Sequence, residues 1–223
     1  MKRRPEPELM DTQAQAEAYA GADFTESNAL FLRLLAEQGP GELIGARALD
    51  LGCGPADIMI RFLARYPQAT CDALDGSEPM LAMARSALAA RPGVVSRARL
   101  ICDKLPSAQL PYQAYDLILS NSLLHHLHEP QVLWRTVRAA GKPGAIVLIM
   151  DLMRPASVGW AAALVESYAG GESEVLRQDF LNSLFASFEP AEVTQQLREA
   201  QLDHALAVHV VSDRHLAVWG RLP

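Results

Sequence analysis

Residues 48–57 read ALDLGCGPAD, an apolar run that ends in an acid and then breaks into a turn with two glycines, Gly52 and Gly54. Glycine has no Cβ, so the backbone of such a turn lets a ligand approach closely. The helix that we expect next directs its free N–H groups toward the same place. A second acid, Asp75, follows another apolar run 25 residues after Asp50. A glycine turn and an acid at the end of the next strand are typical of a doubly wound fold that holds a nucleoside.

The composition is that of one folded α/β domain. The chain has 223 residues, of which 50% are hydrophobic and 21% are charged, so a packed core can form. The formal net charge of −6 argues against a large binding surface for nucleic acid. Three cysteines lie in or beside apolar runs without metal-ligand spacing, and we expect them to be reduced and mostly buried in a cytoplasmic protein. They are Cys53, Cys71 and Cys102.

The first seven residues are basic and rich in proline, and no long apolar run follows them. We therefore expect neither a signal peptide nor a membrane span. A frayed tail is the predicted structure of residues 1–7.

Apolar runs alternate with helical patterns through the middle of the chain. The expected strands are 46–51, 69–75, 97–102, 115–121 and 145–151, and the expected helices between them are 55–66, 77–90 and 129–140. This order predicts a parallel sheet with helices on both faces. Two further apolar runs, 205–211 and 215–220, are joined by a turn of hairpin length. The predicted fold class is thus α/β, a doubly wound Rossmann-like sheet of seven strands, five parallel plus a terminal antiparallel hairpin.

The other segments are expected to surround this core. Residues 1–42 should form a tail and a helical lid, with a turn between two helices near Gly21, and residues 43–151 the cofactor-binding core. A helical insert on the substrate side should occupy 152–189, and its aromatic residues are expected in the core more than in a binding surface. Residues 190–223 should add a last helix and the hairpin to the same domain.

Four motifs, in this order and spacing, resemble the class I S-adenosylmethionine-dependent methyltransferases of the small-molecule type. They are Asp50–Ala56 (DLGCGPA), Asp72–Met80 (DALDGSEPM), Cys102–Pro106 (CDKLP) and Tyr115–Leu127 (YDLILSNSLLHHL), which is followed by GKPG at 141–144. The resemblance covers residues 43–151 and, by architecture, the closing hairpin. Ala56 replaces the third glycine of the first motif, which puts only the fine geometry of the turn in doubt. The resemblance implies S-adenosylmethionine as the cofactor and a small-molecule methyl acceptor, with nucleic acid and membrane not expected as partners.

A dinucleotide fits these residues less well. Its fingerprint needs a third glycine three residues after the second, and that position is Asp57, whose carboxylate would repel a pyrophosphate. S-adenosylmethionine carries a sulfonium and an ammonium, so acidic residues suit it. The alternatives are an NAD(P)-dependent oxidoreductase and a non-catalytic cofactor-binding module of the same fold. Stabilisation by NAD alone would favour the first, and tight cofactor binding without methyl transfer the second.

The resemblance also implies which residues bind the cofactor. Asp75 is expected to accept two hydrogen bonds from the ribose diol, and Gly52 and Gly54 to lie against the methionine part. Asp50 is expected to reach the ammonium or to orient the glycine turn through backbone N–H groups, and Asp103 to bind the adenine amino group. The other expected neighbours are Gly76, Ser77 and Met80 near the ribose and adenine, Asn121 near the ammonium, and Tyr19 at the sulfonium. Ser77 is also a good helix cap, and Tyr19 could simply anchor the lid.

His125, His126 and His128 invite a metal site, which we do not expect from the sequence. Adjacent histidines on a helix or strand point to different sides, and no cysteine or carboxylate nearby completes a ligand set. A general base is the better interpretation of His125 or His126, because histidine titrates near neutral pH and this loop should lie where acceptors enter. Packing or cofactor contact is the alternative. Arg154 is expected to pair with an acidic acceptor or with Asp151.

Overall fold

The computed structural model describes residues 1–39 and 41–223, and its centre is a sheet of seven strands in the order β3-β2-β1-β4-β5-β7-β6. The parallel strands are β1 (Arg47–Leu51), β2 (Thr70–Asp75), β3 (Ala98–Cys102), β4 (Tyr115–Asn121) and β5 (Gly141–Leu152). The hairpin strand β7 (His215–Arg221) runs antiparallel to β5 and to the edge strand β6 (Leu206–Val210). The predicted arrangement of five parallel strands and a terminal hairpin is confirmed.

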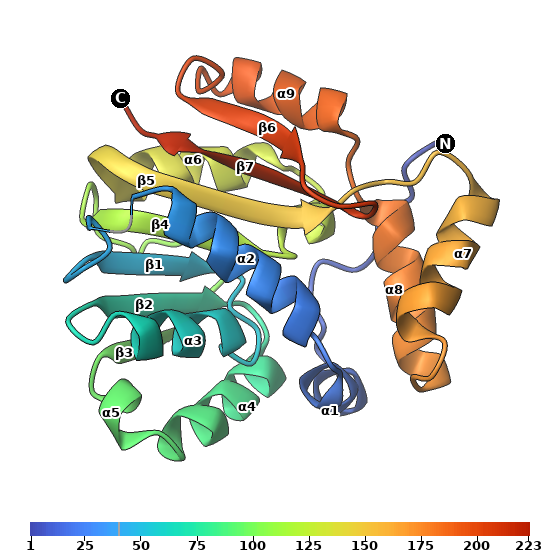
Figure 1. Cartoon of the computed structure of the whole chain (residues 1–223), viewed down its shortest axis with the longest axis horizontal. Coiled ribbons are helices and arrows are strands. Elements are labelled where there is room, and N and C mark those ends of the chain that lie inside the picture. The colour runs from blue at the N-terminus through green and yellow to red at the C-terminus, as the bar shows by residue number, and fades with distance from the viewer. Residues whose placement is uncertain (40) are drawn as a thin grey trace.

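Helices cover both faces of this sheet (Figure 1). One face packs against α2 (Thr25–Glu37), α3 (Asp57–Arg65) and α4 (Glu78–Ala89), which the short α5 (Pro92–Val95) follows. The other face packs against α6 (Gln131–Ala140) and α9 (Pro190–Glu199). Successive strand residues alternate between the two cores, as Ala48 and Leu49 of β1 do.

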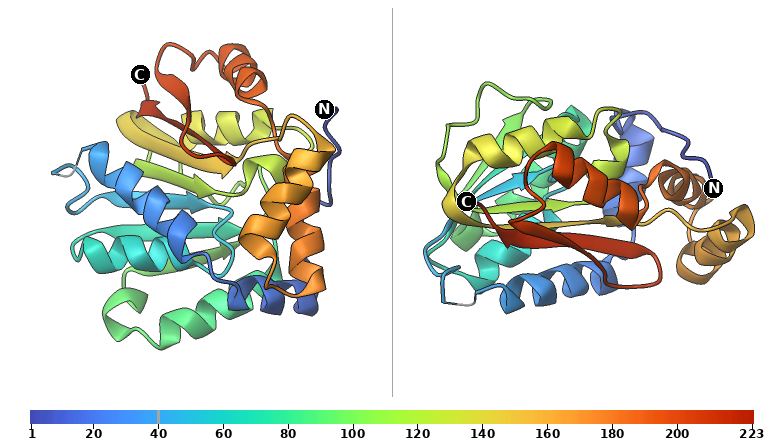
Figure 2. Two further views of the ribbon diagram at one scale, coloured as in Figure 1. Left: turned by 45° about the vertical axis from the view of Figure 1, so that its right-hand side comes forward. Right: turned by 90° about the horizontal axis from the view of Figure 1, so that it is seen from above.

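The strand order reverses at β1, which pairs with both β2 and β4. A crevice is expected at the carboxyl ends of the strands at such a point. Three further helices lie beyond this edge of the sheet: α1 (Gln13–Gly21), α7 (Val158–Ala169) and α8 (Glu174–Ala186) (Figures 1 and 2). They enclose the crevice from the side opposite the strands.

Residues 1–12, which we name the N-terminal strap, are held across this end of the molecule, so the expectation of a frayed tail is wrong. The Arg3 guanidinium donates to the carbonyl oxygens of His125 (2.8 Å) and Leu127 (3.1 Å). It also lies 3.9 Å from the centre of the Phe188 ring, and the Arg4 N–H donates to the Phe185 carbonyl at 2.9 Å. These contacts tie the start of the chain to the end of α8 and to the loop after β4.

All three cysteines are free; Cys53 and Cys71 are buried, whereas Cys102 is exposed. Among the residues that the structure describes, no helix combines the length and the apolar character needed to cross a bilayer.

Candidate functional site

A cavity of about 910 Å³ opens at the carboxyl ends of β1, β2 and β4, a size typical of small-molecule sites. Every residue proposed from the sequence as a cofactor or catalytic residue lines it. They are Tyr19, Asp50, Gly52, Gly54, Asp75, Gly76, Ser77, Met80, Asp103, Asn121, His125 and His126. The sequence therefore identified residues that the fold brings to one place.

The glycine turn after β1 has a backbone that requires glycine. Gly52 and Gly54 have φ values of +69° and +50°, in the left-handed region. A Cβ on Gly52 would lie 2.8 Å from the Cβ of Leu123. Ala56, just before α3, is also left-handed, with φ +69°. For alanine this conformation costs roughly 1–2 kcal/mol, so the missing third glycine is tolerated at a cost in stability.

The Asp75 carboxylate links the end of β2 to this turn. Its Oδ2 accepts a hydrogen bond from the Gly54 N–H and its Oδ1 one from the Ser77 N–H, both at 2.8 Å. Each carboxylate oxygen has two lone pairs, so both remain able to accept from a vicinal diol. Burial raises the pKa of Asp75 above its ordinary value.

Asp50 and Asn121 each present a buried acceptor with no partner among the described residues: Oδ2 of Asp50 and Oδ1 of Asn121. Asp50 lies opposite Leu119 in the pairing of β1 with β4, and Asn121 comes two residues later in β4. Burial and the charge of Asp75 raise the pKa of Asp50 to about 7, against a smaller lowering by the Met59 backbone. Unpaired buried acceptors are costly, and an ammonium supplies both charge and donors. The site thus fits the ammonium of S-adenosylmethionine on its own chemistry.

Ser77, Gly76 and Met80 shape the wall of the cavity through contacts within the chain. The Ser77 hydroxyl accepts from the Met80 N–H (3.3 Å), capping α4, and donates to the Met10 carbonyl (2.7 Å). A Cβ on Gly76 would lie 2.8 Å from the Leu9 side chain. Ser77 is thus a helix cap, and glycine at position 76 makes room for the strap.

Asp103 and Tyr19 both line the cavity and have partners within the chain. The Asp103 carboxylate accepts from the Ser107 hydroxyl (2.7 Å) and the Lys104 N–H (2.9 Å), and these bonds lower its pKa. It therefore orders the loop after β3. The Tyr19 ring packs 4.6 Å from that of Phe24, and burial together with nearby carboxylates raises the pKa of Tyr19 to about 12. Their contacts with adenine and sulfonium stay predictions.

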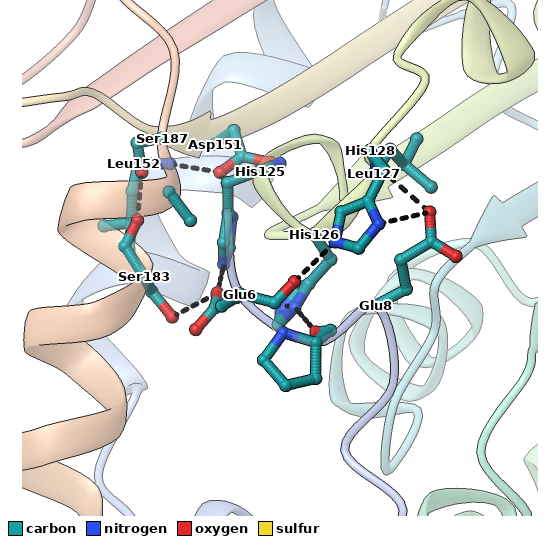
Figure 3. Close-up of polar contacts among 12 residues, drawn as sticks. Glu6, Glu8, His125, His126, Leu127, His128, Asp151, Leu152, Ser183 and Ser187 are labelled. Atoms are coloured by element: carbon teal, nitrogen blue, oxygen red, sulfur yellow. Dashed lines mark hydrogen bonds and ion pairs between the residues drawn. The ribbon is translucent and has the colours of Figure 1, made fainter. Parts of the chain in front are cut away.

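His125 and His126 belong to a 3₁₀ turn, Leu124–His126, that follows β4 (Figure 3). His125 is buried, and its Nδ1 lies 2.5 Å from Oδ1 of Asp151 at the end of β5. Burial works against a charged His125, but the Asp151 carboxylate outweighs it and raises the pKa of His125. Burial and the neighbouring His125 lower the pKa of His126 to about 3. The first ring is therefore oriented by a carboxylate and the second is neutral.

The strap adds a carboxylate to the histidines that sequence reasoning missed. Oε1 of Glu6 lies 3.4 Å from Nε2 of His125 and 3.4 Å from Nδ1 of His126, and it accepts from the Ser183 hydroxyl at 3.0 Å. Two steps of the sequence argument against a metal are thus corrected. The 3₁₀ turn brings both rings to the same side, 4.2 Å apart between centres, and a distant residue supplies the carboxylate. No local spacing could have identified Glu6.

Arg154 does not pair with Asp151, so that alternative of its expected partners is wrong. Its guanidinium lies 2.9 Å from carboxylate oxygens of both Glu189 and Glu192. It thereby ties the end of β5 to the start of α9 and does not line the cavity. Of the insert's aromatic residues, Trp160 is half exposed, whereas Phe180 lines the cavity.

The fold and the cavity together define a nucleoside-binding α/β domain of the doubly wound type. Residues 49–147 match the model of a family described as a methyltransferase domain. An uncharacterized methyltransferase of Mycobacterium tuberculosis is 24% identical over 174 residues, which are 77% of this chain and 85% of that protein. A trans-aconitate 2-methyltransferase of Methylobacterium nodulans is 36% identical over 107 residues, 47% of this chain and 38% of that protein.

Among solved structures, a SAM-dependent methyltransferase from Aquifex aeolicus superposes with a TM-score of 0.70 at 16% identity, covering 95% of this chain and 99% of that one. Together these comparisons support a class I S-adenosylmethionine-dependent methyltransferase family for this chain. Of the two nucleoside cofactors weighed from the sequence, the family supports S-adenosylmethionine.

Proposed function

We propose that the protein transfers the methyl group of S-adenosylmethionine to a nucleophilic O, N, C or S atom of a small molecule by in-line displacement. The observation that carries the proposal is a single cavity. It holds the glycine turn, Asp75, the unpaired acceptors of Asp50 and Asn121, and the carboxylate-oriented His125. The bound cofactor supplies an electrophilic methyl group on a sulfonium.

The residues of the sheet edge bind and orient the cofactor. Asp75 accepts from the ribose diol, while the backbone at Gly52 and Gly54 makes room for the methionine part. Asp50 and Asn121 accept from its ammonium. Methyl transfer then needs the nucleophile about 3 Å from the methyl carbon, in line with the breaking C–S bond. Leu9 of the strap, Tyr19 of α1 and Phe180 of α8 line the cavity and reduce the access of water to this position.

We assign His125 and His126 as the catalytic residues on the acceptor side. Asp151 fixes the ring of His125, so the histidine pair can act on the acceptor group that loses its proton. Glu172 and Asp179 also line the cavity, as does Arg214, which is paired with Asp213 and Glu26. The two carboxylates repel a polycarboxylate such as the one named for the trans-aconitate relative, so we propose a neutral or cationic acceptor.

Binding of S-adenosylhomocysteine, measured by calorimetry, tests the cofactor site. We expect Asp75→Ala to weaken binding at least 100-fold, because two hydrogen bonds to a charged group are worth about 1.5–3 kcal/mol each. Asp116→Ala is the matched control. Asp116 lies at the start of β4, pairs with Lys142 and does not line the cavity. Equal affinity in wild type and Asp75→Ala would contradict the site.

The acceptor is tested by metabolite profiling of a strain that lacks the gene. A species lighter by one methylene should accumulate and should be methylated by the purified protein with labelled cofactor. Tight cofactor binding with no transfer to any component of a broad extract would instead support a non-catalytic module.

A further inference from the structure

We propose that Glu6, His125 and His126 bind a divalent transition-metal ion of the zinc type at the acceptor end of the cavity. These three are the group of potential metal ligands found within the described residues 1–39 and 41–223, and their ligand atoms all lie within 4.8 Å of one another. Two imidazoles and one carboxylate suit zinc better than magnesium or calcium, which prefer all-oxygen sites. The metal site itself does not depend on the proposed function. Only the role of the ion in binding the methyl acceptor rests on it.

The separations of the Glu6 oxygen from the two histidine nitrogens match an ion between them. Tetrahedral zinc binds nitrogen and oxygen at about 2.1 Å, which places neighbouring ligand atoms roughly 3.4 Å apart. Oε1 of Glu6 lies 3.4 Å from both histidine nitrogens. A direct charge-assisted hydrogen bond would be shorter, about 2.7–2.9 Å. The two equal distances therefore correspond to edges of a coordination polyhedron better than to hydrogen bonds.

Two of the three ligands, His125 and Glu6, have a partner that orients them. The contact between Asp151 and Nδ1 of His125 (2.5 Å) leaves the Nε2 lone pair of that ring facing Glu6. Without a cation or a proton between them, this lone pair and the Glu6 oxygen would repel each other. The Ser183 hydroxyl donates to the Glu6 carboxylate at 3.0 Å. Carboxylate–histidine and hydroxyl–carboxylate pairs of this kind commonly orient metal ligands.

Nδ1 of His126 faces two oxygen acceptors, the Glu6 carboxylate at 3.4 Å and the Pro7 carbonyl at 3.3 Å. A proton on this nitrogen can point well at only one of them, whereas an ion attracts both. The ring can ligate through Nδ1 when its proton is on Nε2. In that state the Pro7 carbonyl is a further oxygen beside the ion.

Contacts of the strap with the loop after β4 hold Glu6 in place before any ion enters. The ring Nε2 of His128 lies 2.8 Å from the Glu6 carbonyl oxygen, and the His128 N–H donates to the Glu8 carboxylate at 3.0 Å (Figure 3). Arg3 donates to the His125 carbonyl oxygen at 2.8 Å. The strap is thus pinned on both sides of Glu6. A preformed ligand set of this kind lowers the entropy cost of binding.

His125 and His126 also line the cavity that contains the cofactor residues, so the remaining coordination position is expected on the cavity side. An ion there would attract an acceptor that presents an oxygen, such as a hydroxyl, and would lower its pKa. In the zinc-bound protein, His125 contributes to catalysis by binding the ion, and the ion in turn activates the acceptor.

The test uses the full chain without an amino-terminal tag, stripped with a chelator. ZnCl2 is titrated by calorimetry, and CoCl2 by the visible absorption that tetrahedral nitrogen and oxygen ligands produce. We expect one ion per chain, about 10–100-fold weaker binding in Asp151→Asn, and a larger loss in Glu6→Gln and in His126→Asn. Glu8→Gln, the same charge change on the same strap, should bind zinc as the wild type does.

Absence of zinc binding by the wild type, or equal binding by Glu6→Gln, overturns the metal site. Equal binding by His126→Asn overturns it too, which covers the case in which the Glu6 variant does not fold. S-adenosylhomocysteine binding is measured on the same samples. If the zinc-free protein binds the cofactor and transfers methyl groups, only the proposed role of the ion is refuted. If the wild type does not bind the cofactor at all, the proposed function is refuted.

Discussion

Nδ1 of His125 lies 2.5 Å from Oδ1 of Asp151, and both side chains are almost completely buried. The other oxygen of Asp151 accepts from the His125 backbone N–H at 3.2 Å, and Oδ1 also accepts from the Leu152 N–H at 2.6 Å. The carboxylate thus joins the 3₁₀ turn after β4 to the end of β5. Arg154, three residues later, pairs instead with Glu189 and Glu192.

Replacement of His125 should separate catalysis from cofactor binding. We expect His125→Gln to lower kcat about 10²–10⁴-fold, because a positioned proton-transfer group contributes a factor of this size. The affinity for S-adenosylhomocysteine should change less than twofold. Steady-state kinetics and calorimetry measure the two effects, and the exposed His204→Gln is the control. An unchanged kcat would remove His125 from the mechanism.

The buried Asp50 should make the free protein less stable as pH rises. Its folded-state pKa of about 7 is above the ordinary value of 3.8, so between these values the folded state holds more protons than the unfolded state. Stability is therefore lost from about pH 4 to pH 7 and is flat above. Asp50→Asn should remove this slope and stabilise the protein at pH 8 by on the order of 2–4 kcal/mol. Urea unfolding at pH 5 to 8 measures it, and parallel curves for the two proteins would contradict it.

Cofactor binding should show the opposite trend with pH. The ammonium of the cofactor favours the ionised form of Asp50, so binding below pH 7 must release a proton. We expect the affinity for S-adenosylhomocysteine to increase up to about tenfold per pH unit below 7 and to level off above it. Calorimetry in two buffers of different ionisation enthalpy would detect the proton. Asp50→Asn should bind more weakly and with no such slope.

Arg154 should contribute to stability and not to cofactor binding. Its side chain is 5% exposed, whereas Glu189 and Glu192 are each 42% exposed, so solvent screens the pair. We expect Arg154→Met to destabilise the fold by about 1–2 kcal/mol and to leave the affinity for S-adenosylhomocysteine unchanged. Thermal unfolding and calorimetry test this. A large loss of affinity without a loss of stability would restore a role in the site.

Arg3 should hold the strap closed. Its guanidinium donates to three carbonyl oxygens, those of His125, Leu127 and Ala186. We expect Arg3→Gln to increase hydrogen exchange in residues 4–11 by about tenfold, since losing charged hydrogen bonds costs about 1.5–3 kcal/mol. Exchange measured by mass spectrometry checks this, with Lys2→Gln as the control. Unchanged protection would mean that the strap is held by other contacts.

Local signals were sufficient to predict the sheet and the cofactor side of the site. A nearly continuous apolar run, such as the one that contains Ala48 and Leu49, marks a strand packed on both faces, and Asp75 could be placed because it directly ends such a run. The left-handed backbone at Gly52 follows from the absence of a side chain. These features depend on neighbours within a few residues, which sequence patterns record.

The acceptor side could not be predicted in the same way. Glu6 meets Ser183 and His125 only because the strap crosses the finished fold, and Arg154 meets Glu189 through a contact between separate elements. The 3₁₀ turn that aligns His125 with His126 has no helix or strand period to reveal it. Contacts of this kind depend on tertiary packing, which short-range sequence patterns do not record.

The position of the strap has a consequence for biosynthesis. Arg3 and Arg4 leave the ribosome long before their partners Phe185, Ala186 and Phe188, which are translated only after most of the chain has been made. The nascent protein can therefore pair its five parallel strands, β1 to β5, while the strap is still undocked. Full assembly of the acceptor end is a late event, and a folded but inactive species should precede the active enzyme during synthesis.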